Sequence, residues 1–257
     1  MDLQLKDKVI FVSGGSRGIG LGIVETCLKE GARLTITARG AEALEKTRAR
    51  LAEQFGKDRI WAMAGDMTDS KVIDSAVARA EAEVGPLWGA VANVGGFGSP
   101  LGVDIPDDNW RDAFAQNLDS AYRLSRAALK GMIARKEGSF VFISSIAGLA
   151  AMGSSLTYSA GKAAMNQMSK ELARTAGPSG VRVNTIAPGN IIFPGGTWDI
   201  NSNGPRAENW AKWIKREVPL RRYGKPEEIG AAVAFLLSPV SAFTTGAVIP
   251  VDGGQTK

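Results

Sequence analysis

The stretch Ser13-Gly14-Gly15-Ser16-Arg17-Gly18-Ile19-Gly20 decides the fold of this chain. It follows an apolar run at 9–12 and precedes a helical pattern of apolar residues at 21–28. A strand, a glycine-rich turn and a helix start form a cradle for a dinucleotide phosphate. Glycine lets the main chain approach the phosphate, and the helix start offers free N–H groups to it. The glycine spacing is G-x-x-x-G-x-G, and a plain strand-to-helix loop is the structural alternative.

The composition favours one large α/β domain. The chain has 257 residues, and 44% of them are hydrophobic, which is enough for a sizeable core. No apolar run reaches the roughly 18 residues that span a membrane, and the first residues lack the apolar part of a secretion signal. The one cysteine, Cys27, excludes an intrachain disulfide and lies in an apolar helical pattern. We therefore expect a buried thiol in a cytoplasmic protein without membrane contact.

The chain contains no histidine, which excludes a Ser-His-Asp triad and a histidine-based metal site. We expect no metal. Proton transfer near neutral pH must then use a tyrosine, lysine, carboxyl or thiol group. The net charge is +5, but basic and acidic residues alternate along the chain. This pattern favours a solvated surface with a site for an anionic small molecule over a nucleic-acid interface.

Strand-like and helix-like segments alternate from end to end. The expected strands cover residues 9–12, 34–37, 59–64, 87–92, 139–144, 181–187 and 247–251. The expected helices cover residues 17–30, 41–55, 71–84, 110–135, 156–176 and 226–237. A break of the fourth helix near Asn117 is an open alternative. Strands this apolar are buried on both faces, so the pattern predicts a single-domain, doubly wound, parallel seven-stranded sheet of the Rossmann-like kind.

Two segments place proton chemistry at the carboxyl edge of this sheet. In Tyr158-Ser159-Ala160-Gly161-Lys162, a four-residue step puts Tyr158 and Lys162 on one helix face. An ammonium near a phenol lowers the phenol pKa, which makes tyrosine a usable acid and base. The strand at 139–144 runs into Ser145, whose hydroxyl we expect to bond a carbonyl oxygen beside Tyr158. A chance pairing of the tyrosine and the lysine is the alternative reading.

Taken in this order, the motifs resemble those of the short-chain dehydrogenase/reductase family over essentially the whole chain. Ser145, Tyr158 and Lys162 fall at the family's catalytic serine, tyrosine and lysine, and Asn117 resembles its catalytic asparagine. The resemblance implies that Tyr158 exchanges the proton, Ser145 positions the carbonyl, Lys162 holds the nicotinamide ribose and Asn117 supports a water. The implied cofactor-binding residues are Gly14, Ser16, Arg17, Gly18, Ile19, Gly20, Arg39, Asp66, Met67, Asn93, Gly95, Tyr158, Lys162, Pro188, Gly189 and Ile191.

The end of the second strand indicates which nicotinamide cofactor is used. An NAD site places a carboxylate there to bind the ribose 2′-hydroxyl. Here Ala38 and Arg39 occupy that position, and Arg17 lies in the glycine turn. A guanidinium pairs well with a 2′-phosphate. We therefore expect NADP(H) in preference to NAD(H), with two merely solvent-exposed arginines as the alternative.

The C-terminal part narrows the resemblance. Residues 222–229 and 251–254 are similar to the 3-oxoacyl-carrier-protein reductase branch. That branch tends to carry an arginine where Ser179 stands, which puts docking of an acidic carrier protein in doubt. Residues 191–193 also lack the threonine that often binds the cofactor carboxamide.

The Gly-, Pro- and Asn-rich zone at 188–205 is too long for an ordinary connection, so we expect a substrate loop or lid over about 189–217. Its Phe193, Trp198, Trp210 and Trp213 suit an apolar or ring-bearing substrate. Packing of these aromatic rings on the body or on another subunit is an equal alternative. The resemblance also implies a homotetramer, or a dimer, built through the helices at 110–135 and 155–176 and through the last strand.

The sequence therefore predicts an NADP(H)-dependent oxidoreductase that interconverts a ketone and a secondary alcohol. The substrate is a 3-oxoacyl thioester or a small hydrophobic ketone. The alternative function is a catalytically silent nucleotide-binding protein that acts as a regulator or scaffold. Intact Ser145, Tyr158 and Lys162 favour the enzyme, because a sensor has no need of a proton relay.

Overall fold

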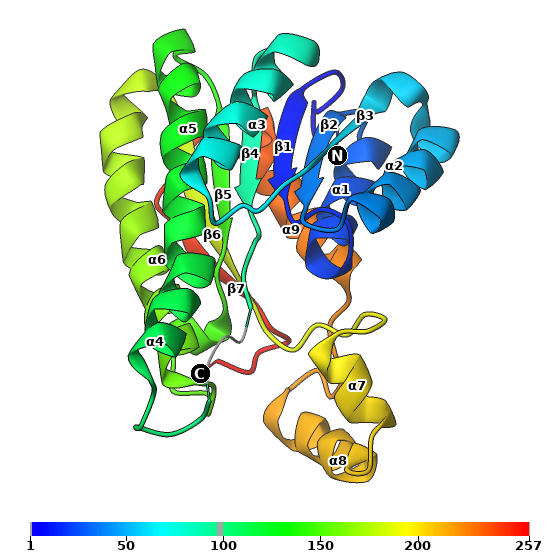
Figure 1. The fold of residues 1–257 in the computed structure, drawn as a ribbon, viewed down its shortest axis with the longest axis vertical. Coiled ribbons are helices and arrows are strands. Elements are labelled where there is room, and N and C mark those ends of the chain that lie inside the picture. Colours follow the sequence, from blue (N-terminus) through cyan, green and yellow to red (C-terminus); the bar gives the residue numbers. More distant parts are fainter. Residues whose placement is uncertain (1, 97–99, 257) are drawn as a thin grey trace.

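A computed structural model describes residues 2–96 and 100–256 of the chain, and it forms one doubly wound sheet (Figure 1). The strands are β1 Val9–Ser13, β2 Arg33–Ala38, β3 Ile60–Ala64, β4 Gly89–Ala92, β5 Ser139–Ile143, β6 Arg182–Pro188 and β7 Val248–Val251. The helices are α1 Gly18–Lys29, α2 Ala41–Phe55, α3 Ser70–Glu83, α4 Asp107–Phe114, α5 Ser120–Arg135, α6 Leu156–Ala176, α7 Thr197–Asn203, α8 Ala207–Glu217 and α9 Pro226–Leu237. All strand pairs are parallel, in the order β3-β2-β1-β4-β5-β6-β7. The predicted fold class and the seven expected strands are confirmed.

Helices bury both faces of the sheet, so successive strand residues enter two separate cores. In β1, Ile10 and Val12 join a core built with α1, α2 and α9. Val9 and Phe11 face the other way into a core built with α3, α5 and α6. Full burial of such a side chain contributes roughly 1.5–3 kcal/mol, which explains why the strands read as continuous apolar runs. Cys27 lies in the first core, and its burial raises the thiol pKa to about 12.

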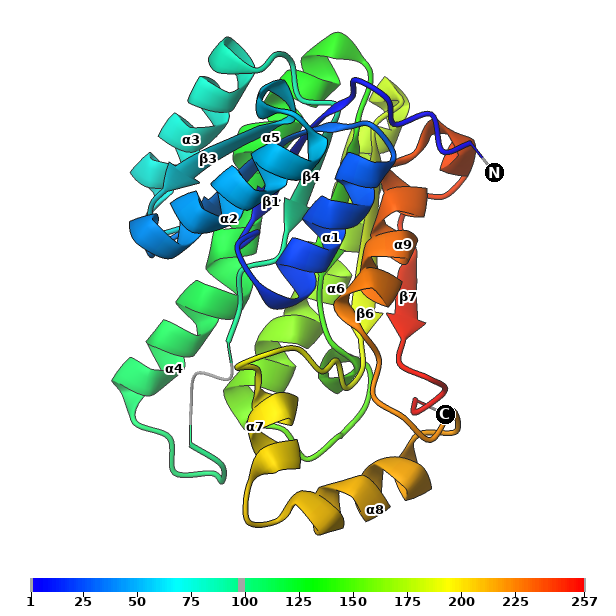
Figure 2. The same cartoon turned by 90° about the vertical axis from the view of Figure 1, so that its right-hand side faces the viewer.

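Two segments settle or change the expected elements. The helical stretch expected at 110–135 is interrupted by a π-helical turn, Ala115–Asp119, between α4 and α5, so the alternative of a break near Asn117 is confirmed. The zone at 188–205, expected to be irregular, contains helix α7. Figure 2 shows α7 and α8 together beyond the carboxyl edge of the sheet. Within the described residues, no helix combines the length and apolar character that a membrane crossing needs.

Candidate active site

The turn after β1 has the shape that a phosphate cradle needs. Gly14 and Gly18 have φ values of 69° and 57°, in the left-handed region that favours glycine. A Cβ atom on Gly20 would lie 2.1 Å from the carbonyl oxygen of Gly14, so the start of α1 packs directly on the turn. The side chain of Arg17, which precedes α1, makes no capping hydrogen bond. The first N–H groups of α1 are therefore not taken up by a capping side chain, which suits an anion.

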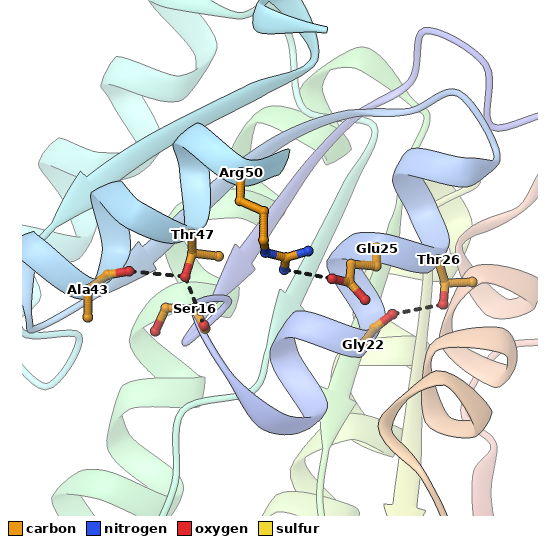
Figure 3. A network of polar contacts seen from close by, with 7 residues as sticks. All are labelled: Ser16, Gly22, Glu25, Thr26, Ala43, Thr47 and Arg50. Carbon is orange, nitrogen blue, oxygen red and sulfur yellow. Dashed lines mark hydrogen bonds and ion pairs between the residues drawn. The ribbon is translucent and has the colours of Figure 1, made fainter. Parts of the chain in front are cut away.

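Helix α2 braces this turn from outside (Figure 3). The Thr47 hydroxyl lies 3.2 Å from the Ser16 carbonyl oxygen and 3.0 Å from the Ala43 carbonyl oxygen, and it donates to these acceptors. The Arg50 guanidinium pairs with the Glu25 carboxylate of α1 at 2.7 Å. These contacts hold α2, the turn and α1 in one arrangement.

The turn opens into a cavity of about 1110 Å³ along the carboxyl edge of the sheet. The predicted cofactor-binding residues that line it are Gly14, Ser16, Arg17, Gly18, Ile19, Gly20, Arg39, Asp66, Met67, Asn93, Gly95, Tyr158, Lys162, Pro188, Gly189 and Ile191. Every residue that the sequence predicted for cofactor binding thus lies in the cavity lining. The cavity joins the glycine turn to Tyr158, so its lining fits an extended dinucleotide with its phosphates on the turn.

The end of the cavity beside β2 and β3 carries charged groups. Arg39 directly follows β2, and no carboxylate occupies that position. The Asp66 carboxylate accepts hydrogen bonds from the Thr68 N–H and the Thr68 hydroxyl, both at 2.9 Å. The N–H bond is the largest cause that lowers the pKa of Asp66, and the nearby Arg39 guanidinium lowers it further. Asp66 is therefore ionised at neutral pH and able to accept a hydrogen bond from a ligand amine.

The structure brings Ser145, Tyr158 and Lys162 together. Ser145 follows β5, while Tyr158 and Lys162 lie one turn apart on α6. The side chains of Ser145 and Tyr158 are hydrogen-bonded to each other. The buried Lys162 ammonium donates to the Ile143 carbonyl oxygen at 2.9 Å and lies 5.8 Å from the centre of the Tyr158 ring. The three side chains thus meet at the carboxyl ends of the central strands.

Asn117 reaches the same region through the π-helical turn. Its side-chain N–H groups donate to the carbonyl oxygens of Gly96 at 2.8 Å and Ala113 at 2.9 Å, and its Oδ1 accepts from the Gly96 N–H at 3.1 Å. A Cβ atom on Gly95 would lie 3.0 Å from Asn117 Oδ1 and 3.1 Å from Lys162 Nζ. Asn117 therefore lies behind the cavity wall and holds the segment after β4 close to Lys162.

Burial dominates the proton equilibria of the two ionisable groups. It lowers the pKa of Lys162 to about 8, because the charged ammonium loses its solvation. It also raises the pKa of Tyr158 above its usual 10, and the hydrogen bond from Ser145 offsets this only in part. The expectation that a neighbouring ammonium lowers the pKa of Tyr158 is therefore wrong in this structure. The phenol is protonated at neutral pH.

Aromatic rings from the segment 189–217 line the other end of the cavity. The Trp198 ring of α7 stacks on Trp213 of α8 at 5.6 Å between ring centres and meets Trp210 edge-on at 5.5 Å. The three tryptophans pack on one another, and all three line the cavity. Packing of these rings explains why the loop-like sequence forms helix α7.

Several lining residues carry no sequence signal. Gln116, Met152, Thr197 and Gln255 line the cavity. Gln255 comes from the C-terminal tail, which is held by hydrogen bonds from the Thr256 N–H and hydroxyl to the Asp252 carboxylate. Only the folded topology shows that this tail reaches the site. Within the part of the chain that the structure describes, no cluster of acidic or cysteine side chains is arranged to hold a metal.

A family model described as enoyl-(acyl carrier protein) reductase matches residues 14–256. The chain belongs to the short-chain dehydrogenase/reductase family. It is 37% identical to an acetoacetyl-CoA reductase of Synechocystis, with 99% of each protein covered. It is 35% identical to 2-(S)-hydroxypropyl-CoM dehydrogenase 3 of Xanthobacter autotrophicus, with 100% of this chain and 99% of the relative covered.

A solved structure is also similar to this chain in fold and in sequence. The L-sorbose reductase of Gluconobacter frateurii, complexed with NADPH and L-sorbose, has 30% identity and a TM-score of 0.92, with 100% of this chain and 99% of the reductase covered. This family member is accordingly an oxidoreductase that interconverts a ketone and a secondary alcohol with a nicotinamide cofactor.

Proposed function

We propose that the protein reduces a ketone with NADPH and that Tyr158 donates the proton. When bound, the cofactor supplies the hydride. The observation that carries the proposal is the meeting of Ser145, Tyr158 and Lys162 at one end of the dinucleotide-sized cavity. The 3-oxoacyl thioester and the small hydrophobic ketone are both compatible with this chemistry.

The roles of the residues follow from their environments. A phenol whose pKa is raised by burial keeps its proton at neutral pH, so Tyr158 is ready to protonate the carbonyl oxygen. Ser145 donates to the same oxygen and stabilises the charge that develops on it. The family resemblance, rather than the environment, supports two further roles: Lys162 holds the nicotinamide ribose, and Asn117 supports a water that links Lys162 to solvent.

Tyr158→Phe tests the proton transfer. We expect kcat for ketone reduction to fall by about 10²–10⁴, because the general acid is lost while the ring is retained. NADPH affinity, measured by fluorescence titration, should stay within about twofold of the wild type on the same reasoning. Tyr122→Phe is the matched control, since Tyr122 is exposed on α5. Unchanged turnover in Tyr158→Phe would contradict the role of Tyr158, whereas a wild type that binds NADPH but reduces no ketone would favour the silent nucleotide-binding protein.

The preference for NADPH over NADH rests on Arg39 and Arg17, with no carboxylate at the end of β2. We expect Arg39→Asp to lower kcat/KM for NADPH by about 10- to 100-fold, because a charge-assisted pair with the 2′-phosphate is lost. Activity with NADH should be retained. Arg48→Ala is the control, since Arg48 pairs with Glu45 on the outer face of α2. A wild-type enzyme that uses NADH equally well refutes this part of the proposal.

We also propose a cytoplasmic homotetramer, or a dimer, in which 189–217 acts as a lid. The partly exposed Ala160 and Ala164 of α6, the edge strand β7 and the fully exposed Phe243 support a contact surface between subunits. Light scattering of the wild type and of Phe243→Asp tests the assembly. A wild type that is monomeric at all concentrations contradicts it.

A further inference from the structure

The charges in the cavity are confined to one side of Tyr158. Among the lining residues that the structure describes, the charged side chains are Arg17, Arg39, Asp66 and Lys162. The first three follow β1, β2 and β3, at the dinucleotide end. The Lys162 ammonium already donates to the Ile143 carbonyl oxygen and lies by the Tyr158 ring. Among the described lining residues, 189–217 therefore contributes no cation to the region that faces Tyr158; the Arg206 guanidinium lies 5.9 Å from the centre of the Trp210 ring, but Arg206 is exposed and does not line the cavity.

Indole rings form the wall of that region instead. Trp198, Trp210 and Trp213 meet in stacked and edge-on pairs with ring centres 5.5–5.7 Å apart. Tyr223 supports them from behind at 5.6 Å from Trp198. An aromatic wall of this kind favours a flat apolar group, because ring contacts add to the area that is buried.

The polar groups on this side are amides and hydroxyls. Asn190 donates to the Gln255 side-chain oxygen at 2.6 Å, and both residues line the cavity. Ser154 and Thr197 add hydroxyl groups to the lining. Neutral groups of this kind orient a carbonyl compound but do not offset the cost of removing a carboxylate from water.

We propose that the substrate is an uncharged ketone that carries an aromatic or similarly flat ring beside its carbonyl group. The inference rests on the proposed function and deepens it. It selects the small hydrophobic ketone over the straight-chain 3-oxoacyl group and over keto acids. The ring lies against the tryptophan wall while the carbonyl oxygen faces Tyr158 and Ser145.

Binding without turnover tests this. Ligand-observed NMR titrations use the complex of the protein with NADP⁺, which has no hydride to give to a ketone. The probes are methyl benzoylformate, the benzoylformate anion and methyl pyruvate, which differ in charge or in the ring. We expect the aromatic ester to bind at least about tenfold tighter than the other two, in line with the cost of burying an unpaired carboxylate and the gain from burying a ring.

Variants locate the preference. Trp210→Leu should remove most of the advantage of methyl benzoylformate over methyl pyruvate, while Trp110→Leu should keep it. Trp110 stacks on Phe114 outside the lining residues and is the matched control. Trp213→Leu serves as a second variant if the melting curve of Trp210→Leu shows unfolding.

Benzoylformate binding as tight as its ester overturns the charge argument. A ring preference that is missing in the wild type, or that survives in both wall variants, overturns the ring argument. Because no turnover is measured, these results are independent of the Tyr158→Phe test. Failure of the proposed function would appear in that variant alone.

Discussion

The two ends of the cavity are built by different means. At the dinucleotide end, short turns after β1, β2 and β3 form the lining. The main chains of Gly14 and Gly20 pack directly against each other there. At the substrate end, side chains of α7 and α8 contact one another, and Gln255 of the C-terminal tail contacts Asn190, 65 residues away in the sequence. The first end is a property of the fold itself. The second end can change its side chains without disturbing the sheet, so substrate choice is free to vary while cofactor binding is kept.

We expect the largest effect on the dinucleotide end from Gly20→Ala. The new methyl group would lie 2.1 Å from the Gly14 carbonyl oxygen and 2.6 Å from the Asn93 side-chain nitrogen, so the surrounding main chain would have to shift. We expect NADPH affinity in a fluorescence titration to fall by roughly 100-fold or more, since the turn must move off the phosphate position. Gly177→Ala is the control, because a Cβ there meets nothing within 4 Å. Equal NADPH affinity in both variants would show that the turn is not the phosphate cradle.

The same contrast decides what the sequence could predict. The turn at 13–20 and the sheet follow from local patterns, because each functional group lies within a few residues of a strand end. The wall of Trp198, Trp210 and Trp213 depends on how α7 and α8 fold back, which no local pattern encodes. The glycines and prolines of 188–205 indicate a loop, yet tertiary packing of Trp198 produces a helix there.

The prediction of a lowered Tyr158 pKa is wrong for a related reason. The four-residue spacing to Lys162 is visible in the sequence, and the two side chains do lie together. Their burial is a property of the folded chain, and it raises the phenol pKa and lowers the ammonium pKa. Spacing predicts which groups meet, whereas their proton equilibria depend on solvent access.

Lys162→Met tests how much the buried ammonium, which lies between the two ends of the cavity, lowers the free energy of unfolding. The buried ammonium has a pKa of about 8, against about 10.5 when unfolded. The folded state therefore disfavours the proton, and at pH 7 the wild type bears this cost. We expect Met to stabilise the ligand-free protein by about 1–3 kcal/mol at pH 7, after loss of the hydrogen bond to Ile143, and to abolish turnover.

The pH dependence supplies the check on this prediction. Between pH 8 and about 10.5 the unfolded wild type binds more protons than the folded wild type, so its stability rises with pH and the advantage of the variant shrinks. Denaturant titrations across this range measure the difference. Lys170→Met, on the exposed side of α6, should show no such trend. A Met variant that is less stable at pH 7 would mean that the ammonium is well solvated or well paired.

The smallest expected effect comes from Thr47. Its side chain contacts the dinucleotide end, where main-chain groups form most of the lining. Thr47→Val removes the hydroxyl that donates to Ser16 and leaves the shape intact (Figure 3). We expect NADPH to bind about two- to fivefold more weakly, since one modest hydrogen bond to the turn is lost, with stability changed by no more than about 1 kcal/mol. Thr26→Val is the matched control, because the Thr26 hydroxyl donates to Gly22 within α1 and not to the turn. If both variants bind NADPH like the wild type, the turn holds its shape through its glycines and strand ends alone, and the division between the two ends is complete.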